Sequence, residues 1–467
     1  MKKRGLIIGA GIAGRILLNE ILENASGQYD IVGFIDDKVT IKVEDMPILG
    51  AIQDIPQVVQ REGIVIVFIA IPSAQGALVR SIIDQCSKAK VKYRIIPRLV
   101  EIIQNNKVSL DLVRPVSTDD LLGRAILKPD QAIVESLIRN KRIMITGAAG
   151  SIGSELVRQI AEFSPSKLIL FDWWENGMFE LEQQLIKKIH LKKFFIIGNI
   201  QDKQRVQSVF KEYSPDIVFH AAAFKHVPLM EENPSEAIKN NILGTKNVAL
   251  AAGEFNVEKF IFISTDKAVN PVSIMGATKA IGEAIVQNYN EIYKTKYIAV
   301  RFGNVLGSYG SVVPLFQKQI SRGGPVTVTD PDMIRYFMTI PEAVQLILQS
   351  AYLGVGGEIF VLDMGEPINI MDFAKTLIKL SGYEPGEDIP IKIIGKRAGE
   401  KMYEELSTLE EALKKTTHDR IFVTRNSINI ENEKLLSTIE LLIKIACFNN
   451  NQSVLSIISQ IIPSMKK

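Results

Sequence analysis

The chain has 467 residues, of which 46% are hydrophobic and 23% are charged, which is the balance of a globular protein of about three domains. Fifty-five Lys and Arg residues against 52 Asp and Glu residues leave a net charge of +3, and this small surplus excludes an electrostatic nucleic-acid binder. Two cysteines exclude a disulfide framework, and the four histidines stand in no metal-ligand spacing, so no metal site is predicted.

The sequence carries no pattern that predicts a membrane segment or a secretion signal. Its most apolar short run, Ile64–Ile71, is far shorter than the roughly 20 residues that a spanning helix needs. The N-terminal residues pass from basic side chains directly into a glycine turn and contain no signal-peptide cleavage region. We therefore expect a cytoplasmic protein without an integral membrane segment and without a nucleic-acid partner.

The first part of the chain has the pattern of a nucleotide-binding sheet. An apolar strand at Arg4–Ile8 is followed by the glycine turn Gly9–Gly14 and by a helical run through Ile21. The acidic pair Asp36–Asp37 follows the second strand, where a carboxylate can bond a ribose. No proton-transfer group follows, so we expect ligand binding, regulation or an empty structural domain here. Further strands, separated by helical stretches, are predicted at 31–35, 64–71 and 92–96.

The same pattern recurs at Arg142–Thr146, where a strand leads into a glycine turn and a helix through Ile160. The sequence therefore predicts an α/β protein with two Rossmann-like, doubly wound parallel-sheet units, the second with a smaller C-terminal substrate-binding portion. We expect an N-terminal domain at 1–105, a linker at 106–138 that ends in a helix, and a catalytic domain at 139–467. Strands of the second unit are predicted at 168–171, 194–197, 217–219, 260–263 and 297–301, with helices at 236–252 and 279–293.

The glycine turn of the second unit is a candidate dinucleotide site. Free backbone N–H groups and the positive end of a helix dipole favour a pyrophosphate, and glycine lets it approach. Asp172 follows the next strand and can bond a ribose, and no arginine follows it to hold a 2′-phosphate, so NAD is favoured over NADP. The alternative is a tight turn without a nucleotide. The candidate contacts in this turn are Gly147, Ala149, Gly150, Ser151, Ile152 and Gly153.

The segment from Phe260 to Lys279 is the most informative one for chemistry. A strand ending in Ser264–Thr265 brings two hydroxyls to the carboxyl edge of the sheet, where ligands of such sheets bind. Asp266 and Lys267 follow at once, either as an acid and base or as a solvated turn pair. Lys279 lies four residues after Met275, where the short-chain dehydrogenases have a YxxxK pair. Methionine cannot transfer a proton.

Seven motifs together resemble the CapD-like polysaccharide-biosynthesis family of UDP-N-acetylglucosamine 4,6-dehydratases, within the extended short-chain dehydrogenase/reductase superfamily. The first unit resembles the nucleotide- or CoA-binding-like N-terminal domain of its long members, through VGFIDD (32–37) and DLLGR (120–124). Long members usually begin with transmembrane helices, which this chain lacks. The seven motifs are TGAAGSIGSEL (146–156), HAAAFKHVPLMEENP (220–234), NNILGT (240–245), STDKAVNPVSIMGATK (264–279), RFGNVLGSYGSVVPLF (301–316), DPDMIRYFMTIPEA (330–343) and RAGEKMYEEL (397–406).

The resemblance implies a reaction and roles for the residues above. Hydride moves from C4 of the sugar to C6 by way of a tightly bound NAD that is regenerated in each turnover. Lys267 is implied as the base at C5, Asp266 as the acid at C6, and Thr265 as a partner of the C4 oxygen. Lys279 contacts the nicotinamide ribose, and Met275 in place of tyrosine favours retention of configuration at C5. A water ordered by Thr265 and Asp266 then takes the C4 hydroxyl proton. Lys267 would need burial or a nearby positive charge, such as Lys279, to lower its pKa.

Further contacts are carried over from the family's motifs. Arg335 and Arg397 are candidates for the diphosphate because guanidinium binds phosphate in a bidentate geometry, and Glu400 for the uridine ribose; ordinary surface salt bridges are the alternative. The family often has arginine or serine at the position of Tyr309. The implied cofactor contacts are Asn199, Ile200, Ala221, Ala222, Ala223, Lys225, Asn241 and Lys279. The implied substrate contacts are Lys225, Thr265, Asn304, Ser308, Gly310, Ser311, Val312, Arg335, Arg397 and Glu400.

The favoured function is therefore an NAD-dependent UDP-N-acetylglucosamine 4,6-dehydratase for surface polysaccharide or glycan biosynthesis, working as a homo-oligomer. Two alternatives stay open. The chain could be a nucleotide-sugar epimerase of the same superfamily, or a non-catalytic nucleotide-sugar-binding regulator. Met275 keeps the second alternative open, whereas Asp266 and Lys267 speak against it.

Overall fold

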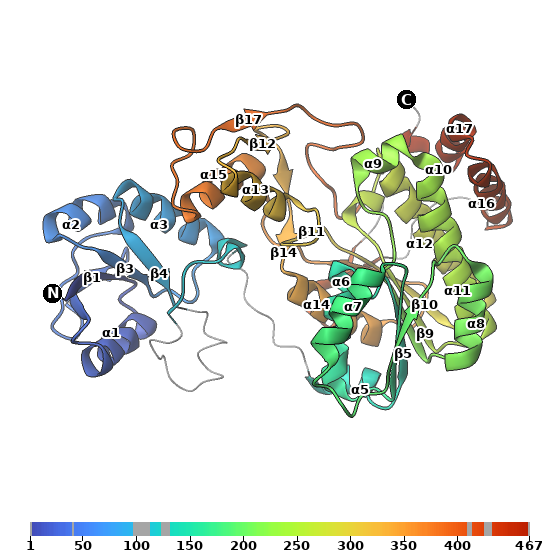
Figure 1. Ribbon diagram of the computed structural model, residues 1–467, viewed down its shortest axis with the longest axis horizontal. Coiled ribbons are helices and arrows are strands. Elements are labelled where there is room, and N and C mark those ends of the chain that lie inside the picture. Colours follow the sequence, from blue (N-terminus) through green and yellow to red (C-terminus); the bar gives the residue numbers. More distant parts are fainter. Residues whose placement is uncertain are drawn as a thin grey trace. The chain divides into compact units, whose positions relative to one another are not determined.

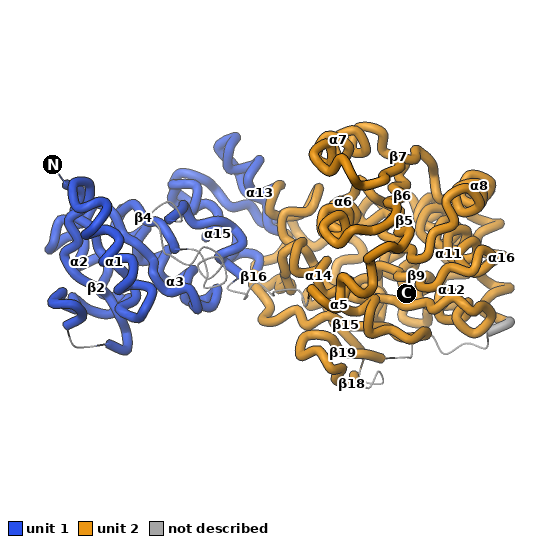
Figure 2. Tube along the Cα trace, turned by 90° about the horizontal axis from the view of Figure 1, so that it is seen from below, with its two compact units in different colours: residues 1–127, 315–328, 370–393 blue, residues 128–314, 329–369, 394–467 orange. Residues whose placement is uncertain are grey.

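The computed structural model describes residues 2–39, 42–96, 113–122, 131–408, 413–424 and 432–465. Contacts divide the chain into two compact units, coloured separately in Figure 2. The first unit contains residues 1–127, 315–328 and 370–393, and the second contains residues 128–314, 329–369 and 394–467. Residues 106–112 and 123–130 of the expected linker lie outside the described residues. The expected domain boundaries therefore stay a prediction.

The first unit is built on a four-stranded parallel sheet of order β2-β1-β3-β4. The strands expected at 31–35, 64–71 and 92–96 are all present, and apolar side chains such as Phe34 and Phe68 fill the core between sheet and helices. Its N-terminal elements are β1 (Lys3–Ile8), α1 (Ile12–Asn24), β2 (Tyr29–Ile35), η1 (Ile52–Asp54), α2 (Ile55–Glu62), β3 (Ile66–Ile69), α3 (Gly76–Lys88), β4 (Lys92–Ile95) and η3 (Thr118–Leu122).

Two later segments of the chain belong to the same first unit. β12 (Val326–Val328) pairs in parallel with β17 (Ile391–Ile393), and α15 (Ile370–Leu380) packs against α3. Asp84 of α3 accepts hydrogen bonds or ion pairs from Lys379 of α15 and from Lys88. The first unit therefore includes residues that the sequence pattern associates with the C-terminal portion of the chain.

The second unit contains a nine-stranded sheet of order β18-β19-β15-β10-β9-β8-β5-β6-β7. The strands from β15 to β7 are parallel, and β19 and β18 add an antiparallel edge. This confirms the Rossmann-like α/β fold class. The strands are β5 (Arg142–Thr146), β6 (Lys167–Asp172), β7 (Lys193–Ile197), β8 (Ile217–His220), β9 (Lys259–Ile263), β10 (Lys296–Arg301), β15 (Ile359–Leu362), β18 (Lys414–Lys415) and β19 (Ile421–Thr424).

Helices cover both faces of this sheet, as the doubly wound pattern requires. α5 (Gln131–Ile138), α6 (Ser151–Ile160) and α14 (Ile340–Leu353) pack together, and α8 (Lys203–Tyr213), α11 (Gly244–Glu254) and α12 (Ile274–Ile292) pack together on the opposite face (Figure 1). The remaining described elements are η4 (Ala161–Phe163), α7 (Glu175–Leu185), α9 (Val227–Glu232), α10 (Pro234–Ala237), η5 (Ile238–Leu243), η6 (Asp266–Ala268), β11 (Asn304–Val305), α13 (Val312–Ser321), β13 (Ile334–Arg335), β14 (Phe337–Met338), β16 (Ile368–Asn369), α16 (Asn432–Cys447), α17 (Asn451–Ile461) and η7 (Pro463–Met465).

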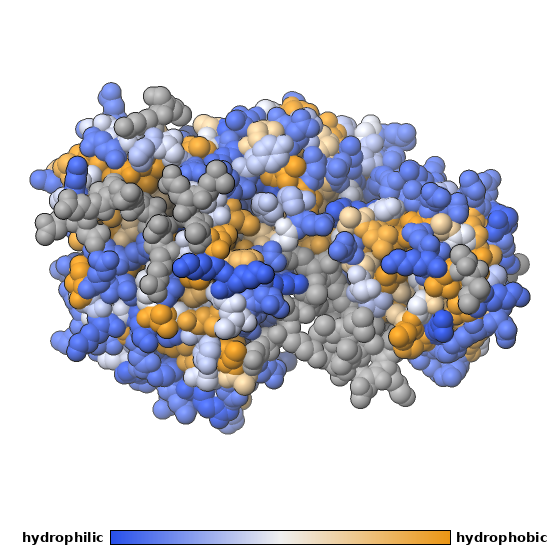
Figure 3. All heavy atoms as spheres, turned by 180° about the vertical axis from the view of Figure 1, so that it is seen from behind, coloured by the Kyte–Doolittle hydropathy of each residue, from blue (hydrophilic) through white to orange (hydrophobic). Residues whose placement is uncertain are grey.

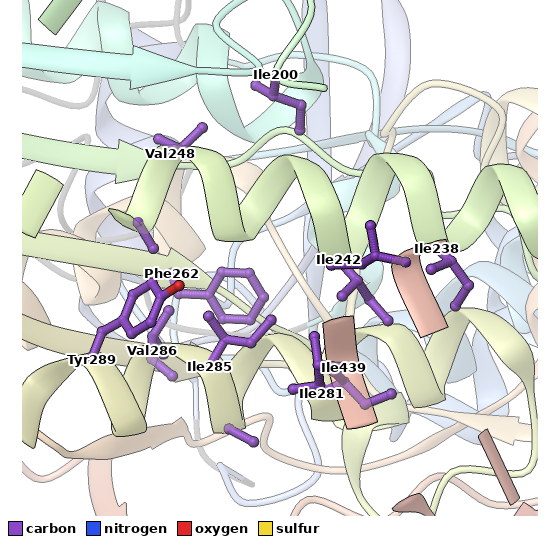
Figure 4. Close-up of a cluster of buried hydrophobic side chains, with 14 of the residues drawn as sticks. Ile200, Ile238, Ile242, Val248, Phe262, Ile281, Ile285, Val286, Tyr289 and Ile439 are labelled. Carbon is purple, nitrogen blue, oxygen red and sulfur yellow. The ribbon is translucent and has the colours of Figure 1, made fainter. Parts of the chain in front are cut away.

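The main hydrophobic core of the second unit lies between the sheet and α12. Phe262 of β9 meets Ile281 and Ile285 of α12, while Ile242 of η5 and Ile439 of α16 close the same cluster (Figure 4). Figure 3 shows that hydrophobic residues on the face seen from behind alternate with hydrophilic ones. Within the described ranges, no helix has both the length and the apolar character that crossing a bilayer requires.

Candidate active site

The second glycine turn has the close backbone packing that only glycine permits. Gly147 has a φ of +69°, and a Cβ there would lie 2.6 Å from the Ala222 nitrogen. A Cβ on Gly153 would lie 1.9 Å from the Gly147 carbonyl oxygen, so the first turn of α6 sits directly on the end of β5. Gly150 caps α6 with extended backbone. The N-terminus of α6 is therefore free of side chains on the turn side, as a pyrophosphate needs.

Asp172 ends β6 beside this turn and braces it. Its carboxylate oxygens accept the backbone N–H groups of Ala149, at 3.0 Å, and of Trp174, at 2.9 Å. Burial raises the pKa of Asp172 even though these backbone hydrogen bonds lower it. The residue lies where the sequence expects it, at the carboxyl end of the strand next to the turn, and the geometry fits a dinucleotide ribose at this position.

Five of the other expected cofactor residues fall into two groups. Ala221, Ala222 and Ala223 follow β8 directly, across the turn from Gly147. By contrast, Asn199 accepts the N–H of Gln201 as part of a turn, and the side chain of Ile200 is 4% exposed within the hydrophobic core. The Ile200 carbonyl accepts the Asn247 side-chain amide at 3.0 Å, so a cofactor contact of Ile200 stays a prediction.

Asn241 lies in a π-helical turn, η5, that interrupts the expected helix at 236–252. Its amide accepts the N–H of Phe224 at 2.8 Å and donates to the Phe224 carbonyl at 2.9 Å and to Thr278 at 3.0 Å. Such single π turns are frequent at functional sites. Here the turn fixes the segment after β8 against α12.

The acid and base expected at the end of β9 are in direct contact. Thr265 caps the short η6 turn and donates from Oγ1 to Asp266 Oδ1 at 2.8 Å. Lys267 Nζ donates to the same Oδ1 at 2.9 Å and to Asn304 Oδ1 at 3.2 Å. Asp266 is 0% exposed, and its Oδ2 has no hydrogen-bond partner among the described residues. A buried, unpaired carboxylate oxygen is costly, so a water or a ligand hydroxyl that bonded this atom would stabilise the site.

The electrostatics of Lys267 differ from the expectation. Burial disfavours its charge, but Asp266 and Glu404 together outweigh burial and raise the pKa of Lys267. Glu404 Oε1 lies 3.7 Å from Lys267 Nζ. Lys267 is therefore an ammonium in this arrangement. Lys267 therefore lacks the lowered pKa that a base near neutrality would need, because two carboxylates rather than a cation lie beside it.

Lys279, by contrast with Lys267, has a lowered pKa. The side chain is 6% exposed, and its Nζ donates to the Ile263 carbonyl at 2.5 Å and lies 4.0 Å above the Phe262 ring. Burial lowers the pKa of Lys279 to about 7, although Glu283 raises it. Ser273 caps α12 by accepting the Gly276 N–H, and Met275, 4% exposed, joins the core one turn before Lys279. α12 thus fixes Lys279 at the end of β9.

The loop after β10 contacts the segment after β8 and the start of α6. Lys225 Nζ donates to Ser308 Oγ at 3.4 Å, and burial lowers the pKa of Lys225. Tyr309 donates its N–H to Ser151 Oγ at 3.0 Å, and its ring contacts Trp174 edge-on at a centroid distance of 5.5 Å. The end of this loop is formed by Gly310, with a φ of +67°, Ser311, whose buried Oγ has no partner among the described residues, and Val312, which begins α13.

The expected arginines divide between two places. Arg335, 9% exposed, donates to the carbonyls of Ile334, Lys401 and Met402 and lies 3.9 Å from Glu404 Oε1. It thus joins the Lys267 cluster. Arg397 and Glu400 instead close an exposed turn through the Arg397 N–H and the Glu400 carboxylate, at 3.0 Å. They line an open cavity of about 560 Å³.

Glu404 is the site residue that sequence reasoning missed. It stands in the motif at 397–406, but nothing in its spacing distinguishes it from Glu405. Only the fold shows that Glu404 is 8% exposed and next to Lys267, whereas Glu405 faces solvent and bonds Lys401. Among the residues that the structure describes, no group of three His, Cys, Asp or Glu side chains is placed to hold a metal.

In the first unit, the carboxylates of Asp36 and Asp37 accept hydrogen bonds from backbone N–H groups. Asp36 accepts the N–H groups of Ala10, Lys38 and Val39, each at 2.8–3.0 Å, and Asp37 accepts that of Ile52 at 2.8 Å. These backbone hydrogen bonds lower the pKa of Asp36 although burial raises it. Asp36 therefore braces its glycine turn as Asp172 does. Which ligand binds there stays a prediction.

The parallel sheet, the glycine turn and the lysine fixed at the end of β9 define a Rossmann-type enzyme of the short-chain dehydrogenase/reductase superfamily. Residues 143–426 match the family described as polysaccharide biosynthesis protein, and residues 2–97 match a CoA-binding domain. The chain belongs to the polysaccharide biosynthesis protein family, as the seven motifs predicted.

Individual relatives agree with this family. The chain is 46% identical to the capsular polysaccharide biosynthesis protein CapD of Staphylococcus aureus, over 90% of this chain and 71% of that protein. It is 38% identical to a UDP-N-acetylglucosamine 4,6-dehydratase (inverting) of Campylobacter jejuni, over 57% of this chain and 78% of that protein. The X-ray structure of Pen from Bacillus thuringiensis superposes with a TM-score of 0.57 at 34% identity, over 63% of this chain and 89% of that one. The protein is thus related to nucleotide-sugar dehydratases and epimerases.

Proposed function

We propose that the protein is a UDP-N-acetyl-D-glucosamine 4,6-dehydratase that forms UDP-2-acetamido-2,6-dideoxy-4-keto-hexose for polysaccharide biosynthesis. One observation carries the proposal: a buried carboxylate with an unpaired oxygen, Asp266, bonds a lysine, Lys267, at the carboxyl edge of the sheet. Dehydration needs one group to take a proton from carbon and another to give one to the leaving hydroxyl. The kinship with a dehydratase of this substrate supports the same reading.

The turn at 147–153, Asp172 and Lys279 fit a dinucleotide. Glycine packing keeps the turn clear, Asp172 holds the turn through the Ala149 N–H at the end of β6, and Lys279 ends beside Ile263 at the sheet edge. When bound, NAD would supply the hydride acceptor for C4 and the hydride donor for C6. We propose NAD rather than NADP because Trp173, Trp174 and Glu175 follow Asp172 and offer no cation for a 2′-phosphate.

The proton chemistry is assigned to the chain's own groups. Asp266, once it has taken the proton of the Lys267 ammonium that it bonds, would donate that proton to the departing C6 hydroxyl through Oδ2, which has no hydrogen-bond partner among the described residues. Lys267 would remove the C5 proton after losing its own, which Asp266 and Glu404 now retain on it. Met275 offers no hydroxyl, so a water held by Thr265 and Asp266 would take the C4 hydroxyl proton. We propose retention at C5, although the Campylobacter relative is named as inverting.

Product analysis tests this function. Purified protein is incubated with UDP-N-acetylglucosamine in deuterated water, and the product is followed by mass spectrometry and proton NMR. Loss of one water with one deuterium at C5 supports the dehydratase, and the coupling pattern of the ring protons gives the C5 configuration. An unchanged mass with an inverted C4 centre would establish an epimerase, to which the chain is also related. Binding without any product would establish a regulator.

The cofactor is tested through the two tryptophans, Trp173 and Trp174, which are the only ones in the sequence. Both follow Asp172, so bound NADH should quench their fluorescence and receive their excitation energy. Asp172→Ala should weaken this transfer, because the ribose loses its carboxylate partner. Equal transfer from NADPH and NADH would argue against the assignment of NAD.

A further inference from the structure

Lys267 lies between two carboxylates that come from distant parts of the chain. Asp266 precedes it in η6, and Glu404 belongs to the segment after β17. The ammonium hydrogen-bonds Asp266 Oδ1 at 2.9 Å and Asn304 Oδ1 at 3.2 Å, while Glu404 Oε1 lies at 3.7 Å. An ammonium has three N–H donors; two of them bond Asp266 and Asn304, and Glu404 lies within ion-pair distance.

Glu404 is held in this place without being fully bonded. Its side chain is only 4% exposed, Oε1 lies between Lys267 and Arg335, and Oε2 is buried with no hydrogen-bond partner among the described residues. A carboxylate oxygen that is buried without a hydrogen-bond partner lowers the stability of the fold by about 1–3 kcal/mol, so such oxygens are rare. The charge of Glu404 therefore acts at short range on Lys267.

The charged groups that face Lys267 are few. Asp266 and Glu404 favour its protonated form, and Arg335 opposes it. Arg335 itself is fixed by three backbone carbonyls. Asp266 is the proposed acid and sits on the same turn, so Glu404 is the separate group through which the fold can set the proton affinity of Lys267.

We infer that Glu404 is a positioning residue of the dehydratase: its carboxylate orients the Lys267 amine toward the sugar and sets the pH at which that amine becomes a base. This inference rests on the proposed function, but it concerns a residue to which no role has been assigned. Glu404 touches Lys267 and not the reacting carbons, and it neither gains nor loses a proton in the step.

The test compares Glu404→Gln with Glu404→Asp in the full-length protein. Removing an opposite charge at this distance should lower the pKa of Lys267 by about 1 to 3 units. The acid limb of the kcat/KM profile of Glu404→Gln should then move to lower pH by that amount, while Glu404→Asp, which keeps the charge, should hold the limb near its wild-type position. An unmoved limb in Glu404→Gln would overturn the inference.

A second readout does not need catalysis. Lys267 is 19% exposed at its side chain, so acetic anhydride can acetylate its neutral form, and peptide mass spectrometry gives the extent at each pH. Half-labelling of Lys267 should occur at lower pH in Glu404→Gln than in the wild type. Glu405→Gln is the matched control, because its exposed carboxylate bonds Lys401 and Asn270 instead, and it should leave the labelling pH unchanged.

The two readouts separate the possible failures. If the wild type makes no dehydrated product, the proposed function fails, and the labelling still decides the role of Glu404. If the wild type is active and Lys267 labels identically in both proteins, only the role of Glu404 fails. Thermal unfolding of each variant shows that it is folded before either result is used.

Discussion

Lys267 pairs with the buried Asp266 and is also the proposed base. Replacing Lys267 should therefore change both the stability and the turnover of the protein. Lys267→Ala should lower kcat by about 100-fold or more, the range for loss of a general base, while UDP-N-acetylglucosamine still binds. The variant also leaves Asp266 buried without its cation, so some loss of stability is expected. Initial rates and titration calorimetry measure the two effects. Unchanged turnover in a folded variant would remove Lys267 as the base.

His220 gives a prediction for pH and stability. The ring is 0% exposed between Thr146 and Thr245, and burial, with a smaller effect of Lys279, lowers the pKa of His220 from 6.5 to about 3. Below pH 6.5 His220 binds a proton in the unfolded chain but not in the folded protein. The free energy of unfolding is therefore highest above pH 6.5 and falls as the pH drops toward 3.

Between pH 7.5 and 5.0 this single ring should cost about 2 kcal/mol of unfolding free energy. Urea unfolding at both pH values should therefore show a smaller loss for His220→Gln than for the wild type. The comparison between the two proteins cancels the titration of all other groups. An equal loss would mean that the His220 ring is protonated in the fold.

Sequence alone finds site residues when they are neighbours in the chain. Asp266 and Lys267 adjoin at a strand end, so their meeting follows from the strand. Glu404 reaches Lys267 only through the fold, and so its effect on the pKa of Lys267 could not be predicted. Likewise the lowered pKa of Lys279 could not be predicted, because the burial that causes it is a tertiary property.

The loop after β10 links elements that the sequence separates widely. Tyr309 bonds Ser151 at the start of α6 and contacts Trp174 at the start of α7. We predict that Tyr309→Ala raises the dissociation constant of NADH about 2- to 10-fold, since an aromatic pair contributes about 0.5–1.5 kcal/mol. NADH fluorescence measures it, and Tyr352→Ala, another exposed tyrosine, serves as the control. Equal affinities in both variants would remove the loop from the cofactor site.

Elements with strong apolar patterns were predictable, and their interruptions were not. Strands β5 to β10 of the second sheet follow from short apolar runs between helices, whereas β15, β18 and β19 were not among the expected strands. The π turn at Ile238–Leu243 could not be predicted from an apolar pattern. Asn240 and Asn241 are stabilised there by side-chain hydrogen bonds rather than by helix propensity. The sequence pattern predicts Arg301 only as the end of a strand. In the structure its buried guanidinium forms a bidentate ion pair with the carboxylate of Glu283 in α12.

At the scale of the whole molecule, the division into units depends on contacts between distant segments. α15 packs against α3 with Lys379 on Asp84, and neither residue carries a pattern that pairs them. A homo-oligomer likewise stays a prediction, and light scattering after gel filtration tests it against the subunit mass of 51.9 kDa.

The C-terminal helices α16 and α17 share the core that holds α12, and this links the end of the chain to the site. Leu442 of α16 is 0% exposed in that core, whereas its neighbour Leu441 is 50% exposed. Leu442→Asp would bury an unpaired carboxylate against η5 or force α16 away from it, which costs several kcal/mol. We expect a clear fall in melting temperature and, because α12 carries Lys279, a fall in turnover. Leu441→Asp should change neither, and equal effects of the two variants would mean that α16 does not pack as described.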